Sequence, residues 1–154
     1  MSALLSQIYQ KIYTNTFSYE NFDCRKNLQK AIYLLENMGV NVGDYSFSWD
    51  NYGPYSLELD CEASQEIPID ALTYSFSELA ESCFEKVKGI VSQHGTYTCT
   101  DWMECIASLH YLKNVLRYND AIIIDELIKR KSYLFNSEEN RRALDIANSI
   151  SVEA

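Results

Sequence analysis

Apolar residues recur every three or four positions along most of this sequence, and that spacing constrains the fold more than any other feature. Five glycines and two prolines supply few tight turns for a chain of 154 residues. The pattern predicts a mainly α, single compact domain (1–154) of six or seven helices with a small one- or two-stranded β element. The predicted helices span 3–13, 23–38, 75–93, 101–117, a stretch from a cap at 119 or 120 to 131, and 137–150, with a short element at 57–61.

Polar residues that accept hydrogen bonds from free backbone amides mark the expected helix starts. Ser75 has Glu78 three residues later, a pair that can bond reciprocally to the first turn of a helix. Gly39 follows the second apolar stripe and suits the left-handed residue that ends many helices. The other expected starts are at Ser2, Asp23, Thr100, Asn119 or Asp120, and Ser137.

The period changes from helical to alternating at residues 45–49. Tyr45, Phe47 and Trp49 alternate with polar residues, which predicts a strand with one buried aromatic face. Gly53-Pro54 is expected to stop this strand. The segments 95–99 and 66–69 are its candidate partners, and a proline at position 68 would confine the second to a sheet edge.

Charge is unevenly distributed in a chain whose net charge is −9. No Lys or Arg lies between Lys30 and Lys86, and this interval holds eleven of the twenty-two acidic residues. Two interpretations stay open: a negative field that attracts a basic partner surface, or a solvated acidic face that aids solubility. The net charge disfavours nucleic acid as a partner, because phosphates repel an acidic surface.

A basic group in residues 129–142 has two interpretations as well. Cations suit the negative ends of helix dipoles, and the alternative is a local nucleic-acid contact. The group consists of Lys129, Arg130, Lys131, Arg141 and Arg142.

The sequence offers little for catalysis, and no catalytic residue, metal ligand or cofactor is predicted. His94 is interpreted as a helix C-terminal cap and His110 as a half-buried, hydrogen-bonded core residue. The five cysteines lack metal or redox spacing, which favours reduced thiols in the cytoplasm. A Cys–His dyad assembled from distant segments is the enzymatic alternative. No apolar run approaches the roughly 18 residues that span a bilayer, so no membrane association is expected.

One motif stands out, at the turn that follows the aromatic strand. Tyr52 and Tyr55 flank a Gly-Pro corner, and tyrosine is common in binding hot spots because it joins a rigid apolar body to a polar tip. The alternative is that the corner only packs a strand onto a helix. The candidate partner-binding residues are Lys30, Tyr52, Gly53, Pro54, Tyr55, Ser56 and Glu58.

Residues 28–35 (LQKAIYLL), Gly39 and residues 47–59 (FSWDNYGPYSLEL) together resemble the core of the YwgA-like proteins. They are similar, more distantly, to the Panacea (SocA-like) antitoxin domain. The resemblance implies a mainly helical domain with a small β element that acts in toxin neutralisation or phage conflict by binding a protein. The positions that carry over from the motif are Leu28, Gln29, Lys30, Gly53, Pro54, Tyr55 and Ser56.

The expected function is therefore that of an antitoxin-like protein-binding module that sequesters a partner protein. If the acidic interval contacts this partner, the partner is expected to have a basic surface. One alternative is an acidic mimic of nucleic acid that uses the interval 31–85 as an inhibitor. Another is a small DNA-binding regulator with the strand at 45–49 as part of a wing. The sequence does not indicate an oligomeric state.

Overall fold

The computed structural model describes residues 1–67 and 72–152 of the chain. These residues form seven helices and one two-stranded antiparallel sheet, which confirms the mainly α class. In chain order the elements are α1 (Ala3–Ile12), α2 (Phe22–Asn37), β1 (Ser48–Asp50), β2 (Gly53–Tyr55), α3 (Leu57–Ala63), α4 (Glu78–Val91), α5 (Cys99–Asn114), α6 (Ile123–Arg130) and α7 (Ser137–Ser149).

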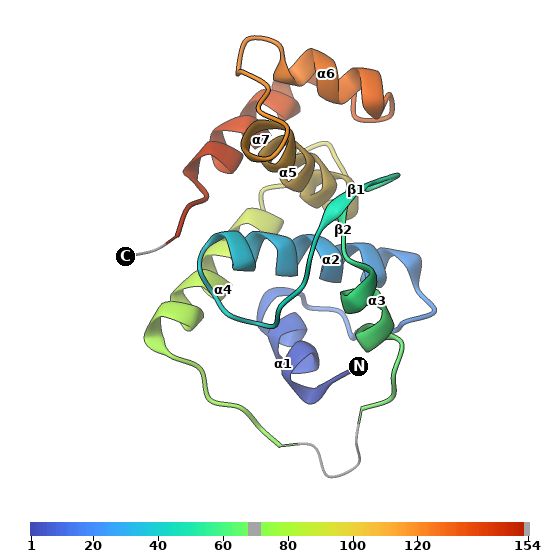
Figure 1. The fold of residues 1–154 in the computed structure, drawn as a ribbon, viewed down its shortest axis with the longest axis vertical. Coiled ribbons are helices and arrows are strands. Elements are labelled where there is room, and N and C mark those ends of the chain that lie inside the picture. The colour runs from blue at the N-terminus through green and yellow to red at the C-terminus, as the bar shows by residue number, and fades with distance from the viewer. Residues whose placement is uncertain (68–71, 153–154) are drawn as a thin grey trace.

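Two long helices, α2 and α5, form the centre of the molecule. Eleven of the sixteen residues of each are buried, so both are covered on nearly every side. Figure 1 shows α2 running across the middle, with α1 and α4 toward one end and α5, α6 and α7 toward the other. The hairpin of β1 and β2 contacts both α2 and α5, and this contact positions the candidate site.

The helix starts follow the predicted capping chemistry but not always the predicted residue. Ser2 caps α1 as expected, because its hydroxyl accepts a hydrogen bond from the Leu5 amide. In α6 the expected cap is absent, and the Asn119 side chain instead bonds the Ala121 amide in the preceding turn. Elsewhere a neighbouring polar residue captures the first free amides: Asn21 rather than Asp23, Ser77 rather than Ser75, Thr98 rather than Thr100, and Asn136 rather than Ser137.

The predicted sheet partners are wrong, since β1 pairs with the segment that directly follows it. Trp49 lies opposite Pro54 and Asp50 opposite Gly53, so Gly53-Pro54 belongs to the second strand and does not stop the sheet. Gly53 has a φ of 91°, a left-handed conformation that glycine adopts without a steric penalty. Pro54 is tolerated because both strands of a two-stranded sheet are edges.

The neighbouring predictions for this region have mixed outcomes. The predicted alternation is confirmed, because Tyr45, Phe47 and Trp49 are half-buried against the core while the residues between them are exposed. The strand predicted over 45–49 is wrong in its bounds, since β1 begins only at Ser48. The candidate partner at 95–99 forms a turn and the start of α5. The other candidate, 66–69, lies partly outside the described residues, as does Asp70 of the acidic interval.

Candidate functional site

Two consecutive side chains of α2 hold the Gly-Pro corner in place. The Gln29 amide donates to the carbonyl of Ser56 and accepts from its amide, both at 2.9 Å. The Lys30 Nζ donates to the carbonyl of Pro54 at 2.8 Å. The Leu-Gln-Lys segment and the corner, which lie far apart in the sequence, are therefore joined by three hydrogen bonds.

Ser56 is the point where the corner becomes a helix. Its hydroxyl accepts from the Leu59 amide at 3.3 Å and donates to Glu58 at 3.0 Å, which caps α3. Ser56 is fully buried, whereas Glu58 is exposed. The serine therefore has a structural role, and the glutamate is displayed at the surface.

Gly53 is the place where the hairpin backbone approaches α5. A Cβ added to Gly53 would collide with the hydroxyl oxygen of Ser108. That hydroxyl is buried and has no hydrogen-bond partner within the described part of the chain. Two independent constraints, the left-handed backbone and the lack of space, require glycine here.

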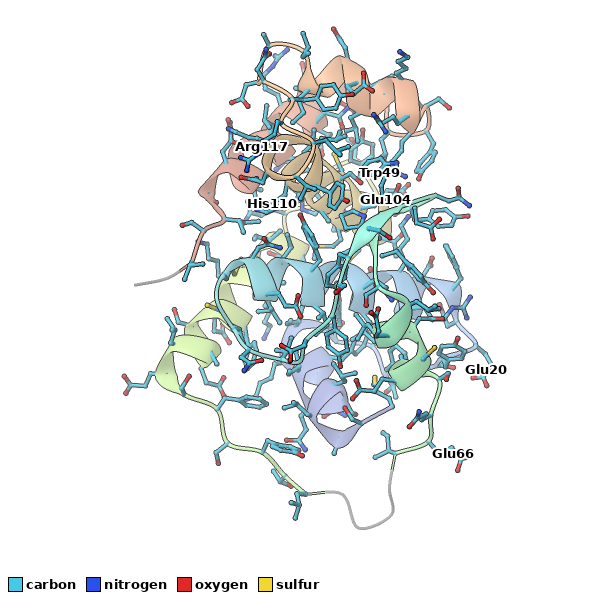
Figure 2. The ribbon with its side chains drawn as sticks, viewed as in Figure 1. Glu20, Trp49, Glu66, Glu104, His110 and Arg117 are labelled. Atoms are coloured by element: carbon cyan, nitrogen blue, oxygen red, sulfur yellow. The ribbon has the colours of Figure 1, made fainter. Side chains whose placement is uncertain are left out.

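A fully buried carboxylate, Glu104 of α5, lies behind the corner among basic side chains. The Lys26 Nζ is 2.5 Å from its Oε1, and the Lys131 Nζ is 3.3 Å from its Oε2. The hydroxyl of Tyr133 also donates to Oε2. Figure 2 places Glu104 and Trp49 together where α5 meets the hairpin, and the Lys131 Nζ lies 4.9 Å from the centre of the Trp49 ring.

This network also fixes the turn of the hairpin. Lys131, besides its contact with Glu104, donates to the carbonyl of Asn51 between the two strands. Sequence reasoning missed Glu104, Lys26 and Lys131 as a group. A signal for Glu104 was present in the sequence, because this acidic residue lies among Trp102, Cys105 and other residues that were predicted to face the core.

Among the three buried lysines of the site, Lys30 is the one that has no carboxylate in direct contact within the described residues. Its side chain is 1% exposed, and burial lowers its pKa to about 7, an effect that Glu104 opposes and that Lys26 and Lys131 reinforce. Burial also lowers the pKa of Lys131. Three buried lysines therefore lie around the fully buried carboxylate of Glu104. Asp101 has an oxygen 3.2 Å from the Lys26 Nζ, but its side chain is only partly buried.

A pocket of about 220 Å³ opens beside the corner. Lys26, Gln29 and Lys30 are its buried lining residues, so they form its inner end. The more exposed lining residues are three aromatic rings and three charged groups: Phe22, Tyr52, Tyr55, Arg25, Asp50 and Asp60.

Two aromatic rings stand on the outer side of this pocket. Phe22 and Tyr52 pack edge to face, with their ring centres 4.9 Å apart, and each residue is 44% exposed. The Lys26 Nζ lies 5.3 Å from the centre of the Tyr52 ring, so the pair is linked to the buried network. Phe22 was not predicted as a site residue.

The seven predicted partner-binding residues thus divide into two groups. Lys30, Gly53, Pro54 and Ser56 are buried and hold the corner together. Tyr52 and Glu58 are exposed, and Tyr55 is half-buried, so these three can reach a docked molecule.

The charged segments noted in the sequence are partly used inside the fold. Within the acidic interval, Glu81 pairs with Lys11 at 2.8 Å, and Glu62 accepts a hydrogen bond from Tyr45. In the basic group, Lys131 contacts Glu104, while two arginines pair with nearby glutamates: Arg130 with Glu126 and Arg142 with Glu139. Three of the five cations of that group are therefore engaged with carboxylates of this chain.

The two histidines have different environments. His110 is buried, its Nδ1 lies 2.7 Å from the hydroxyl of Tyr33, and burial lowers its pKa to about 4. The expectation of a hydrogen-bonded core histidine is thus confirmed. The capping role expected of His94 is wrong, because its Nδ1 contacts the carbonyl of Tyr97 in the loop that follows α4.

A second pocket, of about 550 Å³, is lined by both His94 and Cys99 and lies apart from Tyr52 and Tyr55. Burial and the nearby Asp23 raise the pKa of the Cys99 thiol, so it is protonated at neutral pH. Among residues 1–67 and 72–152, no group of three His, Cys, Asp or Glu side chains is arranged to hold a metal ion. In the same ranges, no helix has the length and apolar character needed to cross a bilayer.

No family model matches the chain, and no curated protein or solved structure matches it either. The likeness to the YwgA-like and Panacea proteins therefore stays a prediction that rests on residues 28–59.

Proposed function

We propose that this chain is a protein-binding module whose partner docks on the outer side of the Gly-Pro corner. The observation that carries the proposal is the Phe22–Tyr52 pair, two rings in edge-to-face contact where the start of α2 meets the hairpin turn, and each residue stays 44% exposed. Large aromatic side chains supply much of the free energy of binding at protein interfaces.

The rigidity of the corner supports the same proposal. Beneath the rings, Gly53 packs against Ser108 and the Asn51 carbonyl is bonded by Lys131. A surface that is already fixed loses little conformational entropy when a partner binds. The buried residues of the motif thus contribute to binding indirectly, because they hold Tyr52 in place.

Acidic residues around the corner favour a basic partner surface. Asp50 and Glu58 are exposed and Asp60 is half-buried, and all three lie within or next to the hairpin and α3. Carboxylates at the rim of an interface speed association with a basic surface and disfavour acidic competitors. Sequestration of a toxin or phage protein in the cytoplasm is the role that the resemblance to antitoxins implies.

The test is a pull-down with the tagged full chain from cells of the source organism. A defined protein should co-purify with the wild type and be lost with Tyr52→Ala and with Phe22→Ala. Tyr74→Ala is the matched control, because Tyr74 is 43% exposed but lies outside the corner. Circular dichroism and thermal melting should show that all three variants fold.

Two results would contradict the proposal. One is a partner that is retained by both Tyr52→Ala and Phe22→Ala. The other is binding that collapses between low and moderate salt with no effect of either variant, which indicates an acidic mimic instead of an aromatic docking site.

A further inference from the structure

The pocket beside the corner contains a buried cation whose bonding capacity is largely unused. A charged lysine has three N–H donors. For Lys30, the contact given by residues 1–67 and 72–152 is one hydrogen bond, to the carbonyl of Pro54. Gln29, next to it at the inner end, has both ends of its amide occupied by the backbone of Ser56. At the inner end of the pocket, Lys30 is therefore the group with free donors for an incoming acceptor.

The charges around Lys30 indicate that this acceptor is negatively charged. Lys26 and Lys131 already share the fully buried carboxylate of Glu104. A buried ammonium without a counterion is costly, and the lowered pKa of Lys30 reflects this cost. An anion in the pocket would supply the missing negative charge and return Lys30 to its charged form.

The remaining lining residues indicate what the anion is attached to and how much charge it carries. Three aromatic rings, those of Phe22, Tyr52 and Tyr55, line the more exposed part of the pocket, so they offer an apolar surface to a flat apolar body. The lining also contains three cations (Arg25, Lys26 and Lys30) and two carboxylates (Asp50 and Asp60), a formal balance of +1. That balance suits a monoanion better than a phosphate dianion.

We propose that this pocket binds a small aromatic carboxylate, with its carboxylate against Lys30 and its ring among Phe22, Tyr52 and Tyr55. A pocket of about 220 Å³ restricts the ligand to a compact molecule. This proposal does not depend on the docked protein, which would contact the outer side of the Tyr52 ring. Either proposal can fail while the other stands.

The test uses benzoate as the probe and the full chain at pH 7, by isothermal titration calorimetry. Benzamide is the neutral control of the same shape, and phenyl phosphate is the dianionic one. Benzoate should bind more tightly than both and should take up protons, seen as a binding enthalpy that depends on the buffer. Lys30→Met should weaken benzoate by at least about tenfold, which corresponds to about 1.4 kcal/mol. Lys88→Met, an exposed lysine of the other pocket, should leave it unchanged.

The location is checked on the wild type, so that the test does not rely on the folding of a variant. Backbone amide shifts in an NMR titration with benzoate should concentrate at residues 52–56 and at the Gln29 side chain. Shifts that concentrate elsewhere would overturn the proposal. So would equal binding of benzoate and benzamide, tighter binding of phenyl phosphate, or no saturable binding of benzoate at roughly 10 mM.

Discussion

Gly53 and Ser108 approach so closely that no side chain fits between the hairpin and α5. Replacing Gly53 with alanine adds a methyl group against the Ser108 hydroxyl and forces a left-handed φ of 91° on an ordinary residue. We expect Gly53→Ala to lower the free energy of unfolding by roughly 2–4 kcal/mol, measured by urea denaturation. Gly89→Ala is the control, because nothing lies within 4 Å of its added Cβ inside α4; it should stabilise the protein by up to about 1 kcal/mol.

A second substitution, at Ser108, separates the energetic cost of the steric collision from that of the strained backbone at Gly53. Removing the Ser108 hydroxyl with Ser108→Ala should relieve the collision but not the backbone strain. Gly53→Ala should therefore cost less in the Ser108→Ala background than in the wild type, by about 1 kcal/mol or more. Equal costs in both backgrounds would mean that the close approach has no energetic consequence.

Glu104 is expected to be the most sensitive single charge in the protein. Glu104→Gln leaves Lys26 and Lys131 buried beside a neutral amide, so we expect a loss of roughly 3–5 kcal/mol in the free energy of unfolding. Glu81→Gln, which breaks the exposed pair with Lys11, should change the same quantity by less than about 1 kcal/mol. Similar effects of the two substitutions would contradict the assigned role of Glu104.

His110 makes stability depend on pH in the acidic range. Its pKa is about 4 in the folded chain and near 6.5 when unfolded, so the unfolded state binds more protons between these values. Stability should therefore fall as pH falls from 6.5 to 4, by roughly 3 kcal/mol from this residue. Denaturation at several pH values should show a shallower dependence in His110→Gln, which keeps an acceptor for Tyr33. An unchanged dependence would place the titration elsewhere.

Lys30 makes stability depend on pH in the alkaline range. Its pKa is about 7 in the folded chain and near 10.5 when unfolded, so the unfolded state again binds more protons between the two values. The contribution of Lys30 to stability should rise from pH 7 to pH 9.5, by roughly 3 kcal/mol. The measurement is the difference between wild type and Lys30→Met, because that difference isolates the contribution of Lys30 from those of other titrating groups. A difference that stays constant with pH would show that Lys30 is already charged and paired.

The helices could be predicted because each presents an apolar stripe that only a helical period explains. Their starts were less certain, since Ser, Thr, Asp and Asn occur within two residues of one another at α2, α4 and α5. The strand partner was missed because Gly53-Pro54 was interpreted as a stop. In the structure the chain reverses at Asn51 and Tyr52, and Gly53-Pro54 begins the second strand, which a two-stranded sheet tolerates because both strands are edges.

The candidate site could be predicted only in part, for a related reason. Tyr52 and the Gly-Pro corner are adjacent in the sequence, so the motif can be recognised without knowledge of the fold. The contact of Glu104 with Lys26 and Lys131 joins residues that are far apart in the chain. Glu104 has a local signal, since it lies among apolar residues, but nothing in the local sequence distinguishes the two lysines from the other bases until the helices are packed.

The arrangement around Glu104 has a consequence for synthesis of the chain. Lys26 on α2 leaves the ribosome early, but Lys131 and Tyr133 follow α6 and are made late. Until they emerge, α5 carries a carboxylate that is only partly neutralised, and the hairpin turn lacks the lysine that bonds its Asn51 carbonyl. The centre of this protein therefore gains its last buried contacts only after the segment beyond α6 has been translated.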